Sequence, residues 1–431
     1  MIFKRLATLT FCAFIVAAAV TAQDIALTID DAVQYASENN ISIAQSKITL
    51  DALKRTKNYS WNSISPSLSL GGNMMFPLDE DARKAQYDYS MSFTGAINIT
   101  LSPSIYSSIQ TAVLNYQNGL LAYDEAKRQI ELNVRIAFYH LLYEQEYIAQ
   151  QERNMQTAEQ QYNQNRRKYE SGQLSELDML SSQVAYERLK PTLEAAEITY
   201  KNDMALFKQT LGIDQAVAVA LTGSLDDALL LDDIIAELSA ENTPSVQSAE
   251  NNVKIAKATL TARRLAAWGP TVSAGWSYGK SKLKPSDTVS TTNAFSISVS
   301  IPLDGYLPWS QGGQSASSAK DSVKNAELAL EKQKTTVAVQ IENYLNQIKL
   351  GQSQLASLQA NVDLAQRSYE MTQRAYNAGS RDFLTLQTAS DALLSARVSL
   401  AQQQYTLITA VFNLEYVLGV PFGSFGKNAA D

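Results

Sequence analysis

A long stretch of coiled-coil character, residues 105–168, restricts the fold of this chain more than any other feature. Apolar side chains recur there at alternating gaps of four and three residues, interrupted only at Lys127 and Glu144: Ile109, Val113, Tyr116, Leu120, Tyr123, Ile130, Val134, Ala137, Leu141 and Ile148. This spacing is typical of a coiled-coil seam rather than of the wider stripe of an ordinary surface helix. A helix of roughly 65 residues is about 100 Å long, whereas typical helices have roughly 12 residues. A helix of this length is therefore not expected in a compact domain.

The stretch is one arm of a predicted helical hairpin over residues 105–211. We expect the turn at Gly172, because glycine readily adopts the positive φ that ends a helix. The pattern returns 207 positions later, the distance from Gly172 to Gly379. The matching residues are Tyr162, Tyr169, Ala185 and Leu211 in the first copy and Tyr369, Tyr376, Ala392 and Leu418 in the second. The chain is therefore predicted to be a tandem duplication.

Each copy is also expected to carry two membrane-facing strands before its hairpin. They are predicted at about 67–76 and 87–101 in the first copy, and at about 271–279 and 293–301 in the second, with a polar loop at 280–292. Apolar residues alternate there with small polar ones, as in Phe295, Ser296, Ile297 and Ser298. A strand of about 10 residues with one apolar and one polar face matches a tilted strand of an outer-membrane barrel.

Four strands cannot close a barrel, and an open sheet edge in lipid costs several kcal/mol for each unpaired backbone group. Several copies of the chain must therefore share one barrel, and three copies would contribute twelve strands. The alternative interpretation is a soluble sandwich with one buried face. The aromatic residues near the predicted membrane interfaces, such as Trp276 and Tyr278, favour the membrane interpretation.

The first 22 residues have the layout of a secretory signal peptide. Lys4 and Arg5 precede an apolar run, and Ala22 ends a small-residue cleavage site. Cys12, the only cysteine, lies inside the run, so the mature chain has no thiol and no disulfide. The loss of Lys4 and Arg5 changes the formal net charge of −7 to −9. An exported acidic chain is not expected to bind nucleic acid.

The predicted domain boundaries follow from the duplication. The first repeat covers 23–212, and a linker of 213–242 forms an equatorial segment. The second repeat covers 243–420 with its hairpin at 309–418, and a short tail of 421–431 follows. The fold class is mainly α with a small β-barrel contribution.

Two copies of helix, strand, strand and long hairpin resemble the TolC-like outer-membrane efflux proteins. The resemblance extends from Asp24 to Val420, and it lies in the doubled architecture more than in any single motif. It implies a homotrimer with a twelve-stranded barrel in the lipid of the outer membrane and a helical tunnel in the periplasm. The partners that it implies are a periplasmic adaptor, which docks on the tunnel, and an inner-membrane transporter.

The resemblance also implies site residues near the hairpin tips. Asp178, Tyr376 and Arg381 match a polar lock that closes the periplasmic end, and Gly172 and Gly379 mark the turns where an adaptor docks. The resemblance also makes Thr385 and Thr388 the candidates for the lumen constriction. Both positions are acidic in a well-known relative, so an acidic ring is not expected here. The alternative for Asp178 and Arg381 is solvated surface charge, and Tyr376 also continues the heptad.

Patterns of catalytic or metal-binding chemistry are not found in the sequence. His140, the only histidine, is expected to pack or face solvent rather than bind a metal. We expect no enzyme, no cofactor and no metal, and we expect an export duct. Two alternatives stay open. The first is a pore-free, adhesive trimeric coiled coil of the periplasm, and the second is a secreted enzyme on a helical scaffold.

Overall fold

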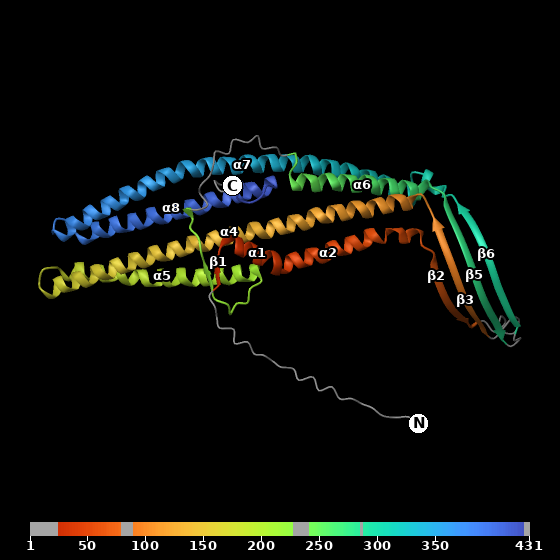
Figure 1. The fold of residues 1–431 in the computed structure, drawn as a ribbon, viewed down its shortest axis with the longest axis horizontal. Coiled ribbons are helices and arrows are strands. Elements are labelled where there is room, and N and C mark those ends of the chain that lie inside the picture. Colours follow the sequence, from red (N-terminus) through yellow and green to blue (C-terminus); the bar gives the residue numbers. More distant parts are fainter. Residues whose placement is uncertain (1–24, 79–88, 227–240, 285–287, 426–431) are drawn as a thin grey trace, which may run out of the picture.

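The computed structural model describes residues 25–78, 89–226, 241–284 and 288–425. The predicted signal peptide, most of the linker after residue 226 and the last six residues lie outside this part. The described chain consists of very long helices with a four-stranded sheet at one end (Figure 1). In the described part, none of the helices is apolar enough over a sufficient length to span a membrane.

The two hairpins repeat each other in register. Helix α4, Ser104–Glu170, and helix α7, Gln311–Asn377, both have 67 residues. Their return arms, α5, Glu176–Leu211, and α8, Phe383–Leu418, both have 36 residues. All four helices begin and end at positions 207 apart, which confirms the duplication that the sequence predicts.

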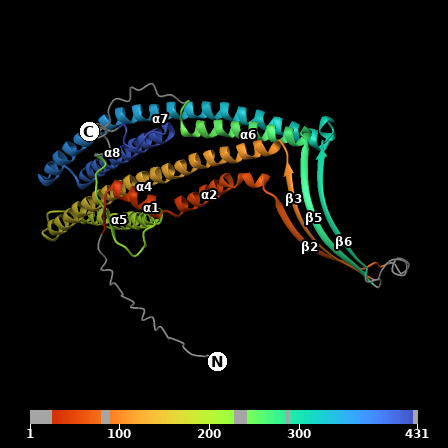
Figure 2. The ribbon, with the colours of Figure 1, turned by 45° about the vertical axis from the view of Figure 1, so that its right-hand side comes forward.

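The shorter helices extend the hairpins toward the sheet. Helix α2, Ile41–Asn58, packs on α4 between α5 and the sheet, and α6, Pro244–Trp268, packs on α7 between α8 and the sheet (Figures 1 and 2). The helical pattern of residues 27–62 predicts one helix. The structure instead has two, α1, Ile29–Asn39, and α2, followed by a short 3-10 helix, Ser60–Ile64. The cause is Asn40, which adopts an extended backbone and caps α2 with its side chain.

The joint between α5 and α2 is tightly packed. Asn40 Nδ2 donates to the carbonyl of Thr210, the last residue but one of α5, at 2.7 Å. Gly212 follows with φ of +75°, and a Cβ there would lie 2.7 Å from the carbonyl oxygen of Asn39. The second repeat has the matching joint, where Gly419 lies against Pro244. Glycine is therefore required at Gly212 and Gly419 for two reasons: the φ angle is positive, and there is no room for a Cβ atom.

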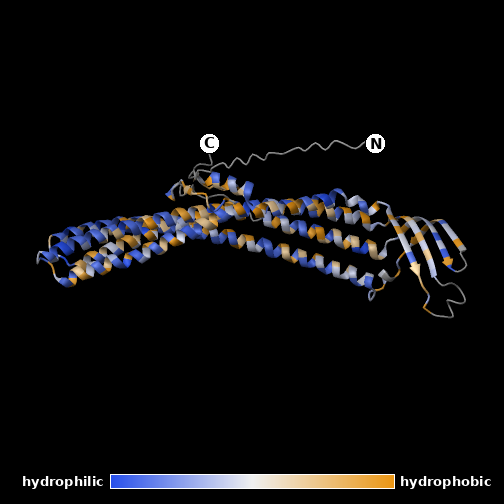
Figure 3. Ribbon diagram, turned by 90° about the horizontal axis from the view of Figure 1, so that it is seen from below, coloured by the Kyte–Doolittle hydropathy of each residue, from blue (hydrophilic) through white to orange (hydrophobic). Residues whose placement is uncertain are grey.

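The sheet is antiparallel with the order β2-β3-β5-β6. Its strands are β2, Ser67–Met75, β3, Tyr89–Leu101, β5, Thr271–Lys284, and β6, Thr288–Ser300. Pairing places Ile97 opposite Trp276 and Trp276 opposite Phe295, so the apolar residues of neighbouring strands share one face. The other face carries small polar pairs such as Ser273 with Ser298. Figure 3 shows that each strand contains both apolar and more polar residues.

The expected loop at 280–292 is mostly strand. Strand β5 continues to Lys284 and β6 begins at Thr288, with Ser281 paired to Ser290. Hydropathy does not reveal this extension, because its residues are mostly Lys, Ser and Thr, and the two apolar ones, Leu283 and Val289, do not make an apolar face. Threonine nonetheless favours strands, and cross-strand pairing extends the hairpin.

The main core lies at the waist of the molecule, where α1, α4, α5 and α8 meet. Its fully buried members include Phe138, Phe207, Leu211 and Ile408. Strand β1, Ile25–Leu27, pairs in parallel with β4, Val219–Leu221, and both contribute to this core. The waist therefore includes the N-terminal segment together with the described start of the predicted equatorial segment, such as β4.

Candidate functional site

The two hairpin tips are built in the same way. Gly172 and Gly379 have φ of +75° and +74°. At each tip the N–H of the following residue donates to a carbonyl five positions back, from Gln173 to Lys168 and from Ser380 to Ala375, as in a Schellman motif. Nothing lies within 4 Å of a Cβ built at either glycine, so only the backbone requires glycine there.

Tyr376 joins the two repeats near these tips. Its ring is buried, with 6% of its surface exposed, and its hydroxyl donates to Asn165 Oδ1 on α4 at 2.5 Å. Gln161 Nε2 donates to the same oxygen at 3.2 Å. The ammonium of Lys168 lies 5.2 Å from the centre of the Tyr376 ring. A residue of α7 is thus held by polar groups of α4.

A small apolar cluster supports this contact. Tyr376 packs with Ala185, Phe383 and Leu386, and its ring centre lies 6.2 Å from that of Phe383. Burial raises the pKa of the Tyr376 hydroxyl, so the group remains protonated at neutral pH and donates its hydrogen bond. The cluster contains residues of α5, α7 and α8.

The structure does not bring Asp178 and Arg381 together within one chain. Ser175 Oγ donates to Asp178 Oδ2 at 2.7 Å, and the N–H of Asp178 donates back to that hydroxyl at 3.2 Å, which caps α5. Arg381 is exposed beside Asp382, the cap of α8. In the described part of the chain, no hydrogen bond or ion pair links Asp178 to Tyr376 or Arg381, but the Asp178 carboxylate adds to the effect of burial in raising the pKa of the Tyr376 hydroxyl.

Thr385 and Thr388 use their hydroxyls inside α8. The N–H of Thr385 donates to Asp382 Oδ1 at 2.8 Å, and its hydroxyl donates to the same oxygen. Thr388 Oγ1 donates to the carbonyl of Leu384 at 2.9 Å. These hydrogen bonds from Thr385 lower the pKa of Asp382, which keeps its carboxylate ionised. The negative charge next to Thr385 is therefore that of Asp382.

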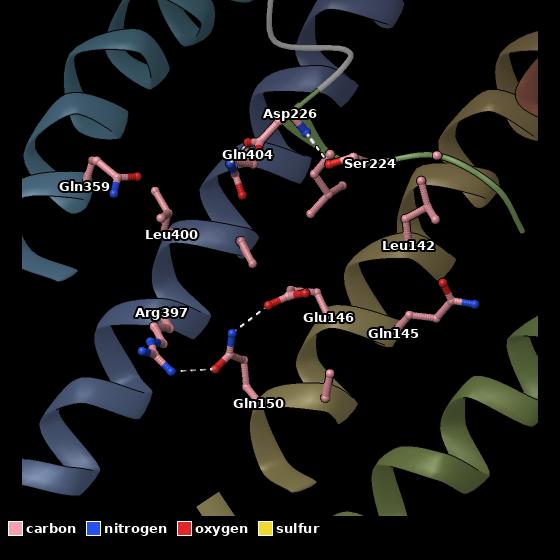
Figure 4. A pocket seen from close by; sticks show the side chains of 14 residues that line it. Leu142, Gln145, Glu146, Gln150, Ser224, Asp226, Gln359, Arg397, Leu400 and Gln404 are labelled. Atoms are coloured by element: carbon pink, nitrogen blue, oxygen red, sulfur yellow. Dashed lines mark hydrogen bonds between the residues drawn. The ribbon is translucent and has the colours of Figure 1, made fainter. Parts of the chain in front are cut away.

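A polar seam between α4 and α8 leads from the tips toward the waist. Asn154 accepts from Ser390 Oγ at 3.3 Å, and Gln150 accepts from Arg397 at 3.3 Å. Gln150 also donates to Glu146, one turn earlier on α4, at 2.5 Å, and both side chains line a cavity of about 580 Å³ that Figure 4 shows between α4 and α8. Hydrophilic groups therefore dominate this interface.

The sequence interpretation missed Asn165 and Gln161, although a signal was present. Continued toward the tip, the heptad of α4 places Gln151 and Asn165 on seam positions, as it does Glu144. These three are buried polar residues of that helix. A polar side chain on a coiled-coil seam must find a partner and often fixes how helices pair.

Comparisons with known proteins agree with this architecture. Residues 235–420 match the family model described as outer membrane efflux protein. The probable efflux pump outer membrane protein TtgC of Pseudomonas putida is 23% identical over 414 residues, which cover 90% of this chain and 82% of that protein.

Solved structures show the same fold. A membrane protein from Pseudomonas aeruginosa superposes with a TM-score of 0.77 at 19% identity, covering 91% of this chain and 93% of that one. The CmeC outer membrane channel of Campylobacter jejuni also gives 0.77, at 16% identity, with 93% and 86% covered.

Proposed function

We propose that this chain is a member of the TolC-like family of outer-membrane efflux proteins, and that three copies of it form an export duct. The duct crosses the outer membrane and extends into the periplasm. It receives its cargo from an inner-membrane transporter through a periplasmic adaptor. The proposal assigns transport, and no catalysis, to the chain.

The main support for this proposal comes from the four-stranded sheet. Strands β2 and β6 are its edge strands, each paired with a single neighbour in the order β2-β3-β5-β6. Their apolar face is exposed in one copy, and Phe295, Ile297 and Val299 are each more than 60% exposed. If β6 of one copy pairs with β2 of the next, three copies close a barrel with lipid outside and small polar side chains inside.

The hairpins supply the tunnel and its docking end. Their tips carry Gly172 and Gly379 in open turns, which an adaptor can contact. Asp178 and Arg381 are available for a lock between neighbouring copies, because their carboxylate and guanidinium are not paired to each other within a copy. Tyr376 and Asn165 would hold the two hairpins of one copy together. Each such contact contributes only about 1 kcal/mol, so an adaptor can open the lock.

The mass of the detergent-purified complex and its conductance in a planar bilayer test the duct. We expect a trimer of a 47.3 kDa chain, less its signal peptide, and discrete channel openings. The negative net charge predicts a preference for cations. A lone subunit would contradict the proposed duct, and extraction into aqueous buffer without detergent would favour the pore-free coiled coil.

A matched pair of lysine substitutions tests which face of β6 meets lipid. Ile297→Lys places a charge on the apolar face and should cost about 2–4 kcal/mol at mid-membrane, with loss of assembled trimer. Ser298→Lys lies on the opposite face and should leave the trimer intact while lowering cation preference. Equal trimer yields for both variants would contradict the assignment of the faces.

Conductance also tests the lock. Asp178→Ala and Arg381→Ala should each raise the resting conductance of the closed channel, since either change removes one half of the pair. Glu152→Ala, an exposed residue of α4 with the same charge as Asp178, serves as the control. Unchanged resting current in both tip variants would remove Asp178 and Arg381 from the lock without affecting the proposed duct.

A further inference from the structure

A group of metal-ligating side chains lies away from the tips, at the edge of the waist. His140 and Glu144 are one turn apart on α4, and Asp203 faces them from α5. Their ligand atoms all lie within 4.8 Å of one another, and His140 Nδ1 is 3.7 Å from Asp203 Oδ2. We propose that these three side chains bind a divalent transition-metal ion, with zinc as the preferred ion.

Glu144 distinguishes this group from an ordinary surface ion pair. Its side chain is buried, with only 7% of the residue exposed. Its Oε2 is enclosed and has no hydrogen-bond partner within the described part of the chain. A buried carboxylate oxygen without a partner is costly, and a coordinated cation satisfies it.

The surroundings suit a bound ion. The ring of His140 lies 5.2 Å from that of Tyr405 on α8, and Tyr200 on α5 accepts a hydrogen bond from Gln145 at 2.8 Å. These aromatic side chains limit water on one side, which strengthens electrostatic attraction. The side chains of His140 and Asp203 are 36% and 32% exposed, so an ion can enter from solvent.

The ligand types select the class of metal. One imidazole and two carboxylates suit zinc and its neighbours, whose ligand distances are about 2.0–2.2 Å. Calcium and magnesium prefer sets made only of oxygen. The ligand atoms would have to approach one another by about 1 Å, within the reach of side-chain rotation, to meet such distances. The bound ion would then tie α4 to α5 beside α8.

Zinc titration of the full-length detergent-solubilised trimer tests the site. The protein is purified on a tag without histidine and treated with EDTA, because His140 is the only histidine of the chain. We expect calorimetry to find one saturable ion per chain. His140→Gln and Glu144→Gln should each weaken binding at least tenfold, whereas Glu152→Gln, on the exposed face of α4, should not change it.

The coordination itself provides a second readout. X-ray absorption at the zinc edge should show one imidazole nitrogen with oxygen ligands, and excess Mg²⁺ should not displace the ion. The proposal is overturned by a lack of saturable binding, by unchanged affinity in His140→Gln, or by a spectrum without imidazole. If Glu144→Gln fails to assemble, His140→Gln decides the question, since His140 is partly exposed and its replacement keeps a polar side chain.

Discussion

The waist and the hairpin tips are held together by different interactions. At the waist, the rings of Phe138 and Phe207 lie 6.3 Å apart inside a continuous apolar core that joins both repeats. At the tips, the apolar cluster around Tyr376 is small, and the remaining links between the repeats are single polar contacts. A buried phenylalanine contributes about 3–5 kcal/mol and a polar contact about 1 kcal/mol. The difference indicates a fixed middle and an end that can open.

The C-terminal residues reinforce the waist. Glu415 is fully buried in α8, and its carboxylate accepts the N–H groups of Gly423 at 2.9 Å and Phe425 at 3.1 Å. Arg128 of α4 donates to the carbonyl of Val420 at 2.8 Å. The short turn after α8 is therefore attached to both repeats.

The largest expected effect comes from Phe138, 1% exposed in the waist core. Phe138→Ala should cost about 3–5 kcal/mol and reduce the yield of assembled trimer. Phe383→Ala, in the small tip cluster, should leave assembly intact and increase channel opening. Thermal unfolding and native mass measurements compare the two. Equal loss of trimer in both variants would break the distinction between waist and tip.

Two glycines with the same backbone conformation give a closer comparison. Gly212 at the waist and Gly172 at the tip both have φ of +75°. Alanine at either position carries a backbone cost of roughly 1 kcal/mol. Only at Gly212 does the new Cβ also meet a carbonyl oxygen, at 2.7 Å. Gly212→Ala should therefore lower the unfolding midpoint clearly more than Gly172→Ala. Equal shifts would show that the joint between α5 and α2 can relax.

Glu144 marks the border between the two regions, and its effect depends on pH. Burial, and then the neighbouring Asp203 carboxylate, raise the pKa of Glu144 in the folded state from the ordinary value of 4.5 to about 7. Below pH 4.5 this carboxyl group is protonated in both states and does not lower the free energy of unfolding. As pH rises from 4.5 through 7, the group increasingly lowers that free energy. In EDTA at pH 8, Glu144→Gln should raise the unfolding midpoint, by the equivalent of about 1–3 kcal/mol at most in the free energy of unfolding. At pH 4 the same substitution should change the midpoint little. Glu152→Gln is the control, and the same response in both variants would contradict the assignment.

Much of the fold could be predicted because it depends on periodicity. Strand alternation placed Ile97, Trp276 and Phe295 on one face, and the register brings them together. The repeat of 207 residues located both hairpins, since identical turns need glycine at Gly172 and Gly379. These features are local and recur along the chain.

The contacts between distant segments could not be predicted in the same way. The bond from Tyr376 to Asn165 joins residues 211 positions apart. The position of Asp178 in the sequence matched that of a lock residue, but in one chain its carboxylate accepts a hydrogen bond from Ser175, the cap of α5. Whether it also meets Arg381 depends on a neighbouring copy, which a single sequence does not place. The break at Asn40 depends likewise on a distant carbonyl, that of Thr210.

The smallest expected effect separates stability from gating. Tyr376→Phe keeps the buried ring and removes only the hydroxyl that donates to Asn165. The unfolding midpoint should fall by the equivalent of about 1 kcal/mol, because one hydrogen bond is lost while the packing remains. Tyr369→Phe, one heptad earlier on α7, is the matched control because the hydrogen bond to Asn165 belongs to Tyr376. If the tips are the opening end, Tyr376→Phe raises resting conductance and Tyr369→Phe does not. If both leave the current unchanged, the seam between the repeats is not what keeps the tips closed, and contacts between neighbouring copies must do so.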